Sequence, residues 1–157
     1  MKHTISLLVR NQFGVLARIA GLFSGRGYNI NSLCVAETQD PTFSAMTIVT
    51  TGDDKIIEQI NKQLNKLIDV VKVVDFREKE YVEREIALIK VNTTAQTRAE
   101  IIQIVSIFRA KVVDINPKSM TIEATGAEDK IVALIEMVKV FGIKEIARSG
   151  RVAMARN

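Results

Sequence analysis

Apolar residues recur along the chain with two different spacings, and the two spacings alternate in a regular order. In the first half, alternation at every second position predicts four strands, over residues 3–10, 30–38, 43–51 and 70–76. Apolar residues three and four positions apart predict two helices between these strands, over residues 15–25 and from residue 53 or 54 to residue 67. The predicted order of elements is therefore βαββαβ.

The second half of the chain repeats this order. Thr97 and Glu100 have the spacing of a capping box, which predicts the start of a helix, and Asn116-Pro117 predicts the turn of a hairpin. The elements expected here are a strand at 86–92, a helix at 97–108, strands at 111–115 and 119–125, a helix at 129–140 and a strand at 143–147. Two such units predict an α+β protein with two ferredoxin-like sheets, each carrying its helices on one face.

A charged segment, Arg77–Glu85, separates the two halves and offers little that a core could bury. We therefore expect an N-terminal domain over residues 1–77, a linker over residues 78–85 and a C-terminal domain over residues 86–157. The same segment could instead extend the flanking strands. Each predicted sheet has one face without helices, and its apolar strands favour burial against a partner over exposure to water. We expect at least a homodimer.

Residues that carry covalent chemistry or bind metals are scarce in this chain. It has one histidine, His3, and one cysteine, Cys34, so a zinc site or a Cys-His pair would be hard to build. We expect His3 at the surface or at a sheet edge, and Cys34 in the core. No dinucleotide-binding glycine motif, P-loop or hydrolase nucleophile motif occurs. The chain is therefore predicted not to be an enzyme, with no metal site and no cofactor of its own.

Composition and charge favour a folded protein over a nucleic-acid or membrane binder. Hydrophobic residues make up 47% of the chain and charged residues 25%, and the net charge is only +4, without a polybasic patch. RNA-recognition domains share the βαββαβ order but need stacking aromatics on the third strand; here Phe43 is the single aromatic, so RNA binding is a weak alternative. Because no signal peptide or long apolar run occurs, we expect a cytoplasmic protein.

The stretch from Asn11 to Leu16 is the most informative in the chain. It leaves the first strand and opens the first helix, where unpaired backbone N–H groups attract a small anion such as a carboxylate. Asn11 could cap this helix. Because glycine costs about 1 kcal/mol in a helix relative to alanine, Gly14 indicates either close approach of a ligand carboxylate or tight packing of helix against sheet. Asn29 could bind an ammonium group or hold a left-handed turn, and these features together favour a sensor for a small acid.

Short motifs carry a resemblance to a known family along essentially the whole chain. They are Asn11-x-x-Gly14-x-Leu16, Arg26-Gly-Tyr-Asn-Ile30, Met46-Thr-Ile48, Glu58-Gln-Ile-x-Lys-Gln-Leu64 with Lys66-Leu67, Val82-Glu-Arg-Glu85, Phe108-Arg109 with Val113-Asp114, and Ala147-Arg-Ser-Gly150. In this order the chain resembles the bacterial small, regulatory subunits of acetolactate synthase (acetohydroxyacid synthase). Its first half resembles an ACT-type amino-acid-binding domain, and its second half resembles that family's C-terminal ferredoxin-like domain.

The resemblance implies a regulatory function in the biosynthesis of the branched-chain amino acids valine, leucine and isoleucine. By this implication the chain binds valine, the end product, and both activates and feedback-regulates a separate catalytic large subunit, which would hold thiamine diphosphate, magnesium and FAD. In the family the effector sites lie between the paired ACT domains of a homodimer. The site residues implied are Asn11, Gly14, Val15 and Leu16 of one chain, with Asn29 and Ile30 of the other completing the pocket.

One position departs from the family pattern. Ala45 stands where the family often has a basic residue before Met-Thr-Ile. It lies outside the implied pocket, so it bears on the strength of regulation more than on family membership. A stand-alone ACT-type amino-acid sensor that acts on another target, such as a transporter or a transcription regulator, is the alternative function.

Overall fold

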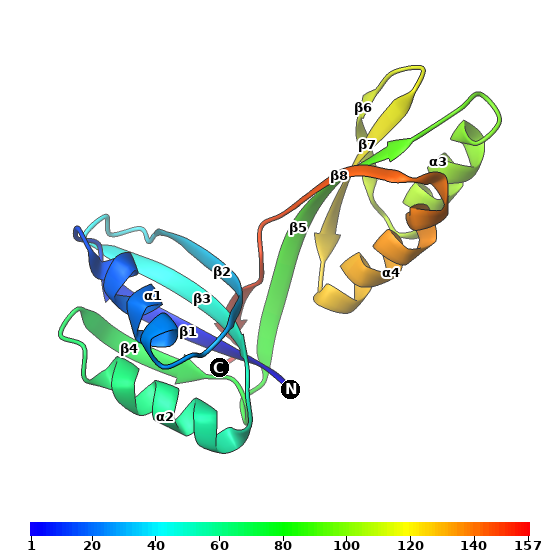
Figure 1. Cartoon of the computed structure of the whole chain (residues 1–157). Coiled ribbons are helices and arrows are strands. Elements are labelled where there is room, and N and C mark those ends of the chain that lie inside the picture. The colour runs from blue at the N-terminus through cyan, green and yellow to red at the C-terminus, as the bar shows by residue number, and fades with distance from the viewer. The chain divides into compact units, whose positions relative to one another are not determined.

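The computed structural model describes all residues, 1–157. The chain forms two compact units, the first made of Met1–Val82 together with Arg151–Asn157 and the second of Glu83–Gly150. Each unit contains an antiparallel sheet and two α-helices (Figure 1). The predicted fold class, two ferredoxin-like βαββαβ units, is confirmed. None of the helices combines the length and the apolar character that crossing a membrane requires.

The first unit contains the predicted elements in the predicted order. They are β1 (Lys2–Arg10), α1 (Val15–Gly25), β2 (Ile30–Glu37), β3 (Phe43–Thr51), α2 (Asp54–Asn65) and β4 (Val70–Asp75). The strand order in the sheet is β2-β3-β1-β4, so β1 and β3 lie inside while β2 and β4 form the edges. Figure 1 shows α1 and α2 on the same face of this sheet.

The core of the first unit lies between the helices and alternate residues of the inner strands. Its buried members are Ile5, Leu7, Val9, Val15, Ile19, Phe23, Met46, Ile48, Ile57, Ile60 and Leu64. Helix α2 illustrates the sequence pattern behind this core, because its three buried residues recur at intervals of three and four positions. The Asp53 side chain caps α2 by accepting from the backbone N–H of Ile56 at 2.9 Å.

The second unit repeats the arrangement. Its elements are β5 (Tyr81–Asn92), α3 (Arg98–Ile107), β6 (Lys111–Ile115), β7 (Ser119–Gly126), α4 (Glu128–Val138), a 3-10 turn (Lys139–Phe141) and β8 (Ile143–Arg148). The strand order is β6-β7-β5-β8. The predicted capping box is wrong: the Thr97 side chain makes no cap bond to α3. Its hydroxyl is engaged in the preceding turn instead, where it accepts from the backbone N–H of Thr94 at 2.9 Å.

The predicted boundaries between the two domains differ from the structure in two places. Residues 78–85 were expected to form a linker, but β5 begins at Tyr81, so the charged segment extends a strand. Residues 151–157 were expected to belong to the domain over residues 86–157, but they group with the first unit. There β9 (Val152–Ala155) pairs with β5, a strand that the sequence pattern did not predict.

The C-terminal strand covers part of the helix-free face of the first sheet. Buried Arg151 donates from its guanidinium to the Thr4 hydroxyl at 2.6 Å, and the backbone N–H of Ala153 donates to the Thr47 hydroxyl at 3.4 Å. Thr4 and Thr47 alternate with the core residues of β1 and β3, which places them on this face. Part of the face that we expected to need an external partner is therefore covered by the chain's own terminus.

The single histidine and the single cysteine lie in different environments from those predicted. His3 is 6% exposed, and its ring nitrogen Nε2 lies 3.0 Å from the carbonyl oxygen of Gly52, so it is buried rather than at the surface. Cys34 is half-buried on the edge strand β2 rather than in the core. Both differences arise because strand pairing, which a single sequence does not give, decides what covers each side chain.

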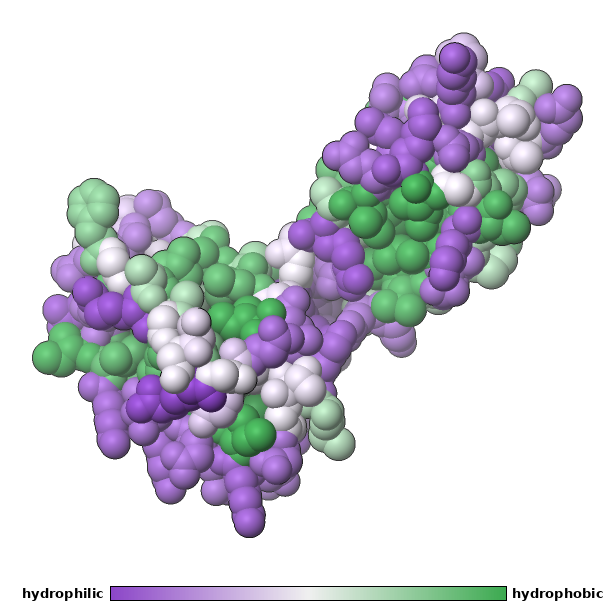
Figure 2. Space-filling view, in the orientation of Figure 1, coloured by the Kyte–Doolittle hydropathy of each residue, from purple (hydrophilic) through white to green (hydrophobic).

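The outward sides of α2 and α4 differ in polarity (Figure 2). The exposed side of α2 carries polar residues such as Lys55, Glu58 and Lys62. On α4, by contrast, Val132 and Met137 are exposed, and Figure 2 shows hydrophobic surface over this helix. A helix that carries apolar residues on its outer side, in addition to its core-facing side, is typical of a region that another molecule covers.

Candidate functional site

A cavity of about 260 Å³ lies where β1 ends, α1 begins and β2 ends. It is lined by Val9, Arg10, Asn11, Gln12, Val15, Leu16, Val35, Ala36, Glu37, Ser44 and Met46. The three segments meet because β1 and β2 both pair with β3, so that Val9 and Glu37 both lie beside Ser44. The turn singled out in the sequence therefore forms one wall of a cavity.

The start of α1 presents unpaired backbone N–H groups at this wall. The helix begins at Val15, whose own N–H makes only a long turn bond, 3.4 Å, to the carbonyl oxygen of Gln12. The N–H groups of Leu16 and Ala17 have no acceptor within the chain. No acidic residue occupies the first turn of α1. This helix start therefore retains the capacity to bind an anion.

Gly14 is the N-cap of α1, and its backbone lies in the left-handed region with φ +79°. Only glycine adopts this conformation freely, which gives Gly14 a local structural role. A Cβ at this position would approach the guanidinium of Arg18, at 3.2 Å from Nη1, and no atom of the sheet. Tight packing of helix against sheet is therefore wrong as the reason for this glycine. Ligand approach stays a prediction.

Asn11 does not cap the helix, which corrects the predicted structural role. Its side-chain N–H group donates to the carbonyl oxygen of Pro41 at 2.9 Å and to the Glu37 carboxylate at 3.2 Å. Asn11 therefore ties the turn to the loop between β2 and β3. That loop is itself ordered by Asp40, whose pKa is lowered because the Thr42 hydroxyl and backbone N–H both donate to its carboxylate.

The floor of the cavity is apolar and buried. Val9, Val15 and Met46 are each at most 3% exposed, because they belong to the core of the first unit. Leu16 and Val35 stand at the rim with 44% and 39% of their surface exposed. An apolar floor, a helix start on one wall and a carboxylate on another describe a binding site for a small molecule with polar and aliphatic parts.

Within one chain, the structure brings together only part of the predicted site. Asn11, Val15 and Leu16 line the cavity, and Gly14 lies in the same turn. Asn29 and Ile30 lie at the opposite end of the sheet, since Ile30 pairs with Thr50 whereas Glu37 pairs with Ser44. Asn29 does not hold a left-handed turn, because its φ is not positive. Its backbone carbonyl accepts from the Thr50 hydroxyl at 2.6 Å instead.

Sequence reasoning missed the wall that β2 contributes. Val35, Ala36 and Glu37 follow Leu16 by about twenty residues and reach the cavity only through the pairing of β2 with β3. The turn at residues 38–42 predicted this hairpin, so the pairing of β2 with β3 could be predicted from the sequence. The register of that pairing, which places Glu37 beside the cavity, could not be predicted.

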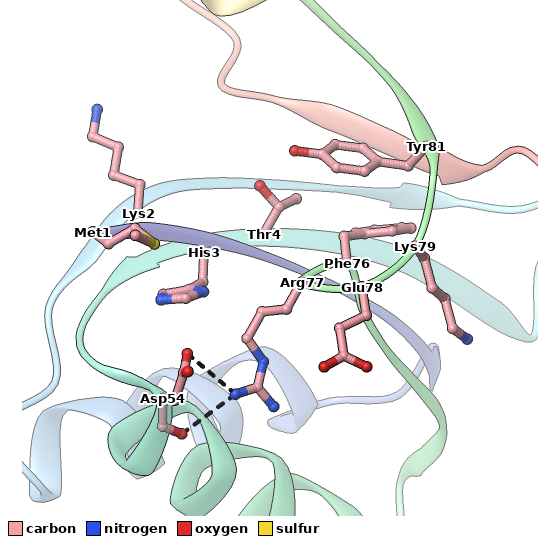
Figure 3. A pocket seen from close by; sticks show the side chains of 10 residues that line it. All are labelled: Met1, Lys2, His3, Thr4, Asp54, Phe76, Arg77, Glu78, Lys79 and Tyr81. Atoms are coloured by element: carbon pink, nitrogen blue, oxygen red, sulfur yellow. Dashed lines mark hydrogen bonds and ion pairs between the residues drawn. The ribbon is translucent and has the colours of Figure 1, made fainter.

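A second cavity, of about 530 Å³, lies elsewhere in the first unit and has a different character (Figure 3). Half of its lining residues are charged, and Arg77 crosses it to reach the Asp54 carboxylate at 3.5 Å. The hydrogen bond with Asp75 raises the pKa of the Arg77 guanidinium. Its ion pair with Asp75 makes this side chain part of a structural ion-pair network. None of the predicted site residues lies here, and the first cavity fits an aliphatic ligand better.

Comparison with known proteins identifies the family. A family described as "Small subunit of acetolactate synthase" matches residues 84–157, and one described as "AHAS small subunit-like ACT domain" matches residues 5–72. The acetolactate synthase small subunit of Aquifex aeolicus is 56% identical over 156 residues, which cover 99% of this chain and 81% of that protein. A probable acetolactate synthase small subunit of Archaeoglobus fulgidus is 53% identical over 156 residues, with 99% and 98% covered.

A solved structure agrees with these sequence comparisons. The crystal structure of the acetolactate synthase small subunit from Thermotoga maritima matches with a TM-score of 0.89 and 45% sequence identity. The match covers 100% of this chain and 98% of that chain. The resemblance drawn from the sequence motifs is thereby confirmed.

Proposed function

Because the chain belongs to the family of acetolactate synthase small subunits, we propose that it binds valine and thereby sets the activity of a separate catalytic large subunit. The ACT domain supports a regulatory role, and the name small subunit implies a large-subunit partner. The finer proposal is that the chain activates that partner and mediates feedback inhibition by valine. Thiamine diphosphate, magnesium and FAD then belong to the large subunit.

The cavity beside the start of α1 is the observation that carries the proposal. Its volume of about 260 Å³ lies just below the ~300–1,000 Å³ of pockets that hold drug-sized ligands, so it fits a smaller molecule such as an amino acid. Unpaired N–H groups near Gly14, Val15 and Leu16 suit the carboxylate. The buried floor of Val9, Val15 and Met46 suits an aliphatic side chain.

A homodimer through the ACT domains would complete this site. Strand β2 is a free edge of the first sheet, and free edges favour pairing with another strand. If two copies of β2 pair antiparallel about a two-fold axis at the middle of the strand, near Leu33 and Cys34, the beginning of one strand lies opposite the end of the other. Asn29 and Ile30 of the partner subunit would then lie beside Glu37 and the cavity.

A site shared by two subunits explains how valine could regulate an enzyme at a distance. A ligand shifts a conformational equilibrium only by its difference in affinity between the two states. Valine held between two chains binds well only when the β2 strands are in register, so its binding stabilises one packing of the paired sheets. The large subunit would respond to that packing, and its binding would in turn change the affinity for valine.

Calorimetry and reconstitution test the proposal. We expect the purified chain to bind L-valine, and to bind D-valine far more weakly because a site that fixes the carboxylate, the ammonium group and the side chain together is stereospecific. We expect the purified large subunit to gain acetolactate synthase activity when the chain is added, and to lose that gain when valine is added. Absence of heat with any branched-chain amino acid, or a large subunit that ignores the chain, would overturn the proposal. Purification with a transporter or a transcription regulator instead would indicate a stand-alone sensor.

A further inference from the structure

We propose that Glu37 is a specificity-determining residue of the effector site, which selects amino acids over other carboxylic acids by binding their ammonium group. This inference rests on the proposed function, because it assigns a charged partner to the ammonium group of the effector, in addition to the neutral side chain of the partner subunit's Asn29. It names a residue that neither the family motifs nor the turn at residues 11–16 includes.

The position of Glu37 supports this assignment. It is the last residue of β2 and lines the same cavity as Val15 and Leu16, the first residues of α1. Val35 also lines the cavity and lies two positions before Glu37 on the same strand, so the two side chains share one face. The β2 wall thus combines an aliphatic residue with a carboxylate.

A hydrogen bond orients the carboxylate. The Asn11 side chain donates to Glu37 Oε1 at 3.2 Å and also to the carbonyl oxygen of Pro41 at 2.9 Å. No cation forms an ion pair with Glu37 in the first unit, in contrast to Asp69 and Asp75, which pair with Arg18 and Arg77. Glu37 therefore keeps oxygen lone pairs available for a ligand, since a carboxylate can accept about four hydrogen bonds.

The two walls of the cavity carry opposite charge. The start of α1 has a partial positive charge from its N–H groups, Arg10 at the end of β1 adds a cation to the lining, and Glu37 supplies a negative charge on the β2 wall. An α-amino acid at neutral pH also carries both charges, on two groups bonded to the same α-carbon, so each charged group can meet an opposite charge. A carboxylic acid without an amino group would gain the contact with the helix start but would be repelled by Glu37.

Titration with two ligands that differ in one group tests this inference. L-Valine and 3-methylbutanoate have the same aliphatic carbon skeleton and carboxylate, but only valine has the ammonium group. We expect the wild-type chain to bind valine much more tightly than 3-methylbutanoate. In Glu37→Gln, valine should bind roughly tenfold more weakly because a hydrogen bond to a charged group is lost, while 3-methylbutanoate should bind equally well or better. Glu37→Lys should reduce the preference for valine further.

A matched control separates this effect from a general change in charge. Glu58→Gln removes a carboxylate from the exposed side of α2, outside the cavity, and should leave the preference for valine unchanged. If valine binds but the preference is the same in wild type, Glu37→Gln and Glu37→Lys, the assignment of Glu37 is wrong while the proposed function stands. If the wild-type chain binds no branched-chain amino acid, both are wrong. Circular dichroism of each variant checks that it is folded.

Discussion

Gly14 meets two demands at the scale of a single residue. Its positive φ of 79° is needed for the chain to turn from β1 into α1, and its missing side chain leaves the helix start open. The first demand is purely local and would exist without any ligand. A substitution of Gly14 can therefore test ligand binding only if its effect is compared with that of a second substitution at Gly14 that strains the backbone equally.

Gly14→Asp and Gly14→Asn form such a pair. Asp and Asn adopt the left-handed conformation more readily than other non-glycine residues, so each should lower the free energy of unfolding by a similar amount, about 1 kcal/mol. The Asp carboxylate about 4 Å from the ligand carboxylate would cost on the order of 4 kcal/mol at a near-surface dielectric. Calorimetry should show valine binding abolished in Gly14→Asp and retained, though weaker, in Gly14→Asn.

Two results would contradict this expectation. Equal loss of binding in both variants would mean that bulk, not charge, disturbs the site, so the ligand carboxylate would not lie at the helix start. A much larger loss of stability in urea denaturation than the backbone strain predicts would assign Gly14 a packing role that its surroundings do not indicate.

At the scale of elements, the edge strand β2 would connect the proposed site to dimer formation. Its beginning holds Asn29 and Ile30 close to Thr50, and its end holds Glu37 close to the cavity. These two halves of the predicted site lie at opposite ends of one strand. They can act together only if a second copy of the strand lies alongside, which makes dimerisation through β2 a condition for the predicted six-residue site.

The single cysteine provides a direct test of this pairing. Cys34 lies in the middle of β2 and is free and half-buried. In two antiparallel β2 strands related by a two-fold axis near Leu33 and Cys34, the two Cys34 side chains would lie within roughly 8 Å of each other. A short bifunctional maleimide should therefore link two chains into one covalent dimer, visible by denaturing electrophoresis. The Cys34→Ser variant should show no such product.

Failure of this cross-link in a sample that light scattering shows to be dimeric would mean that the dimer forms through another surface. In that case Asn29 and Ile30 could not complete the cavity, and the effector site would need other residues from the partner subunit.

At the scale of the whole molecule, the C-terminal tail belongs to the unit that contains the N-terminus. Residues 151–157 pack on the first unit although residues 83–150 form the second. The contact depends on Arg151, which is 9% exposed and donates to the Thr4 hydroxyl. Arg156 is exposed and contacts the first unit through its backbone N–H, which donates to the carbonyl oxygen of Glu80.

These two arginines allow a matched comparison. Arg151→Ala removes a buried hydrogen bond from a charged donor and should lower the free energy of unfolding of the first unit by about 2 kcal/mol. Arg156→Ala keeps its backbone bond and should change stability by less than about 0.5 kcal/mol. Hydrogen exchange should accelerate in β1 and β3 for Arg151→Ala alone. Equal behaviour of the two variants would contradict a stabilising role for the tail.

The sequence by itself determined the elements and their order. Strand and helix periodicity reflects burial of one face, which is a local property, so all four helices and the strands β1 to β4 and β6 to β8 were predicted within a few residues, whereas β5 begins at Tyr81 instead of residue 86. It also determined the turn at residues 11–16 and the family. Its local errors, the caps assigned to Asn11 and Thr97, arose because polar side chains found other partners nearby.

Only the tertiary structure decided which distant segments meet. The register between β2 and β3 places Glu37 at the cavity, and the return of residues 151–157 covers Thr4 and Thr47. Neither contact leaves a periodic trace in the sequence, because both depend on pairing between segments that are far apart along the chain. The sequence therefore determined which surfaces were apolar, whereas the packing of strands decided what covered them and which charges faced the site.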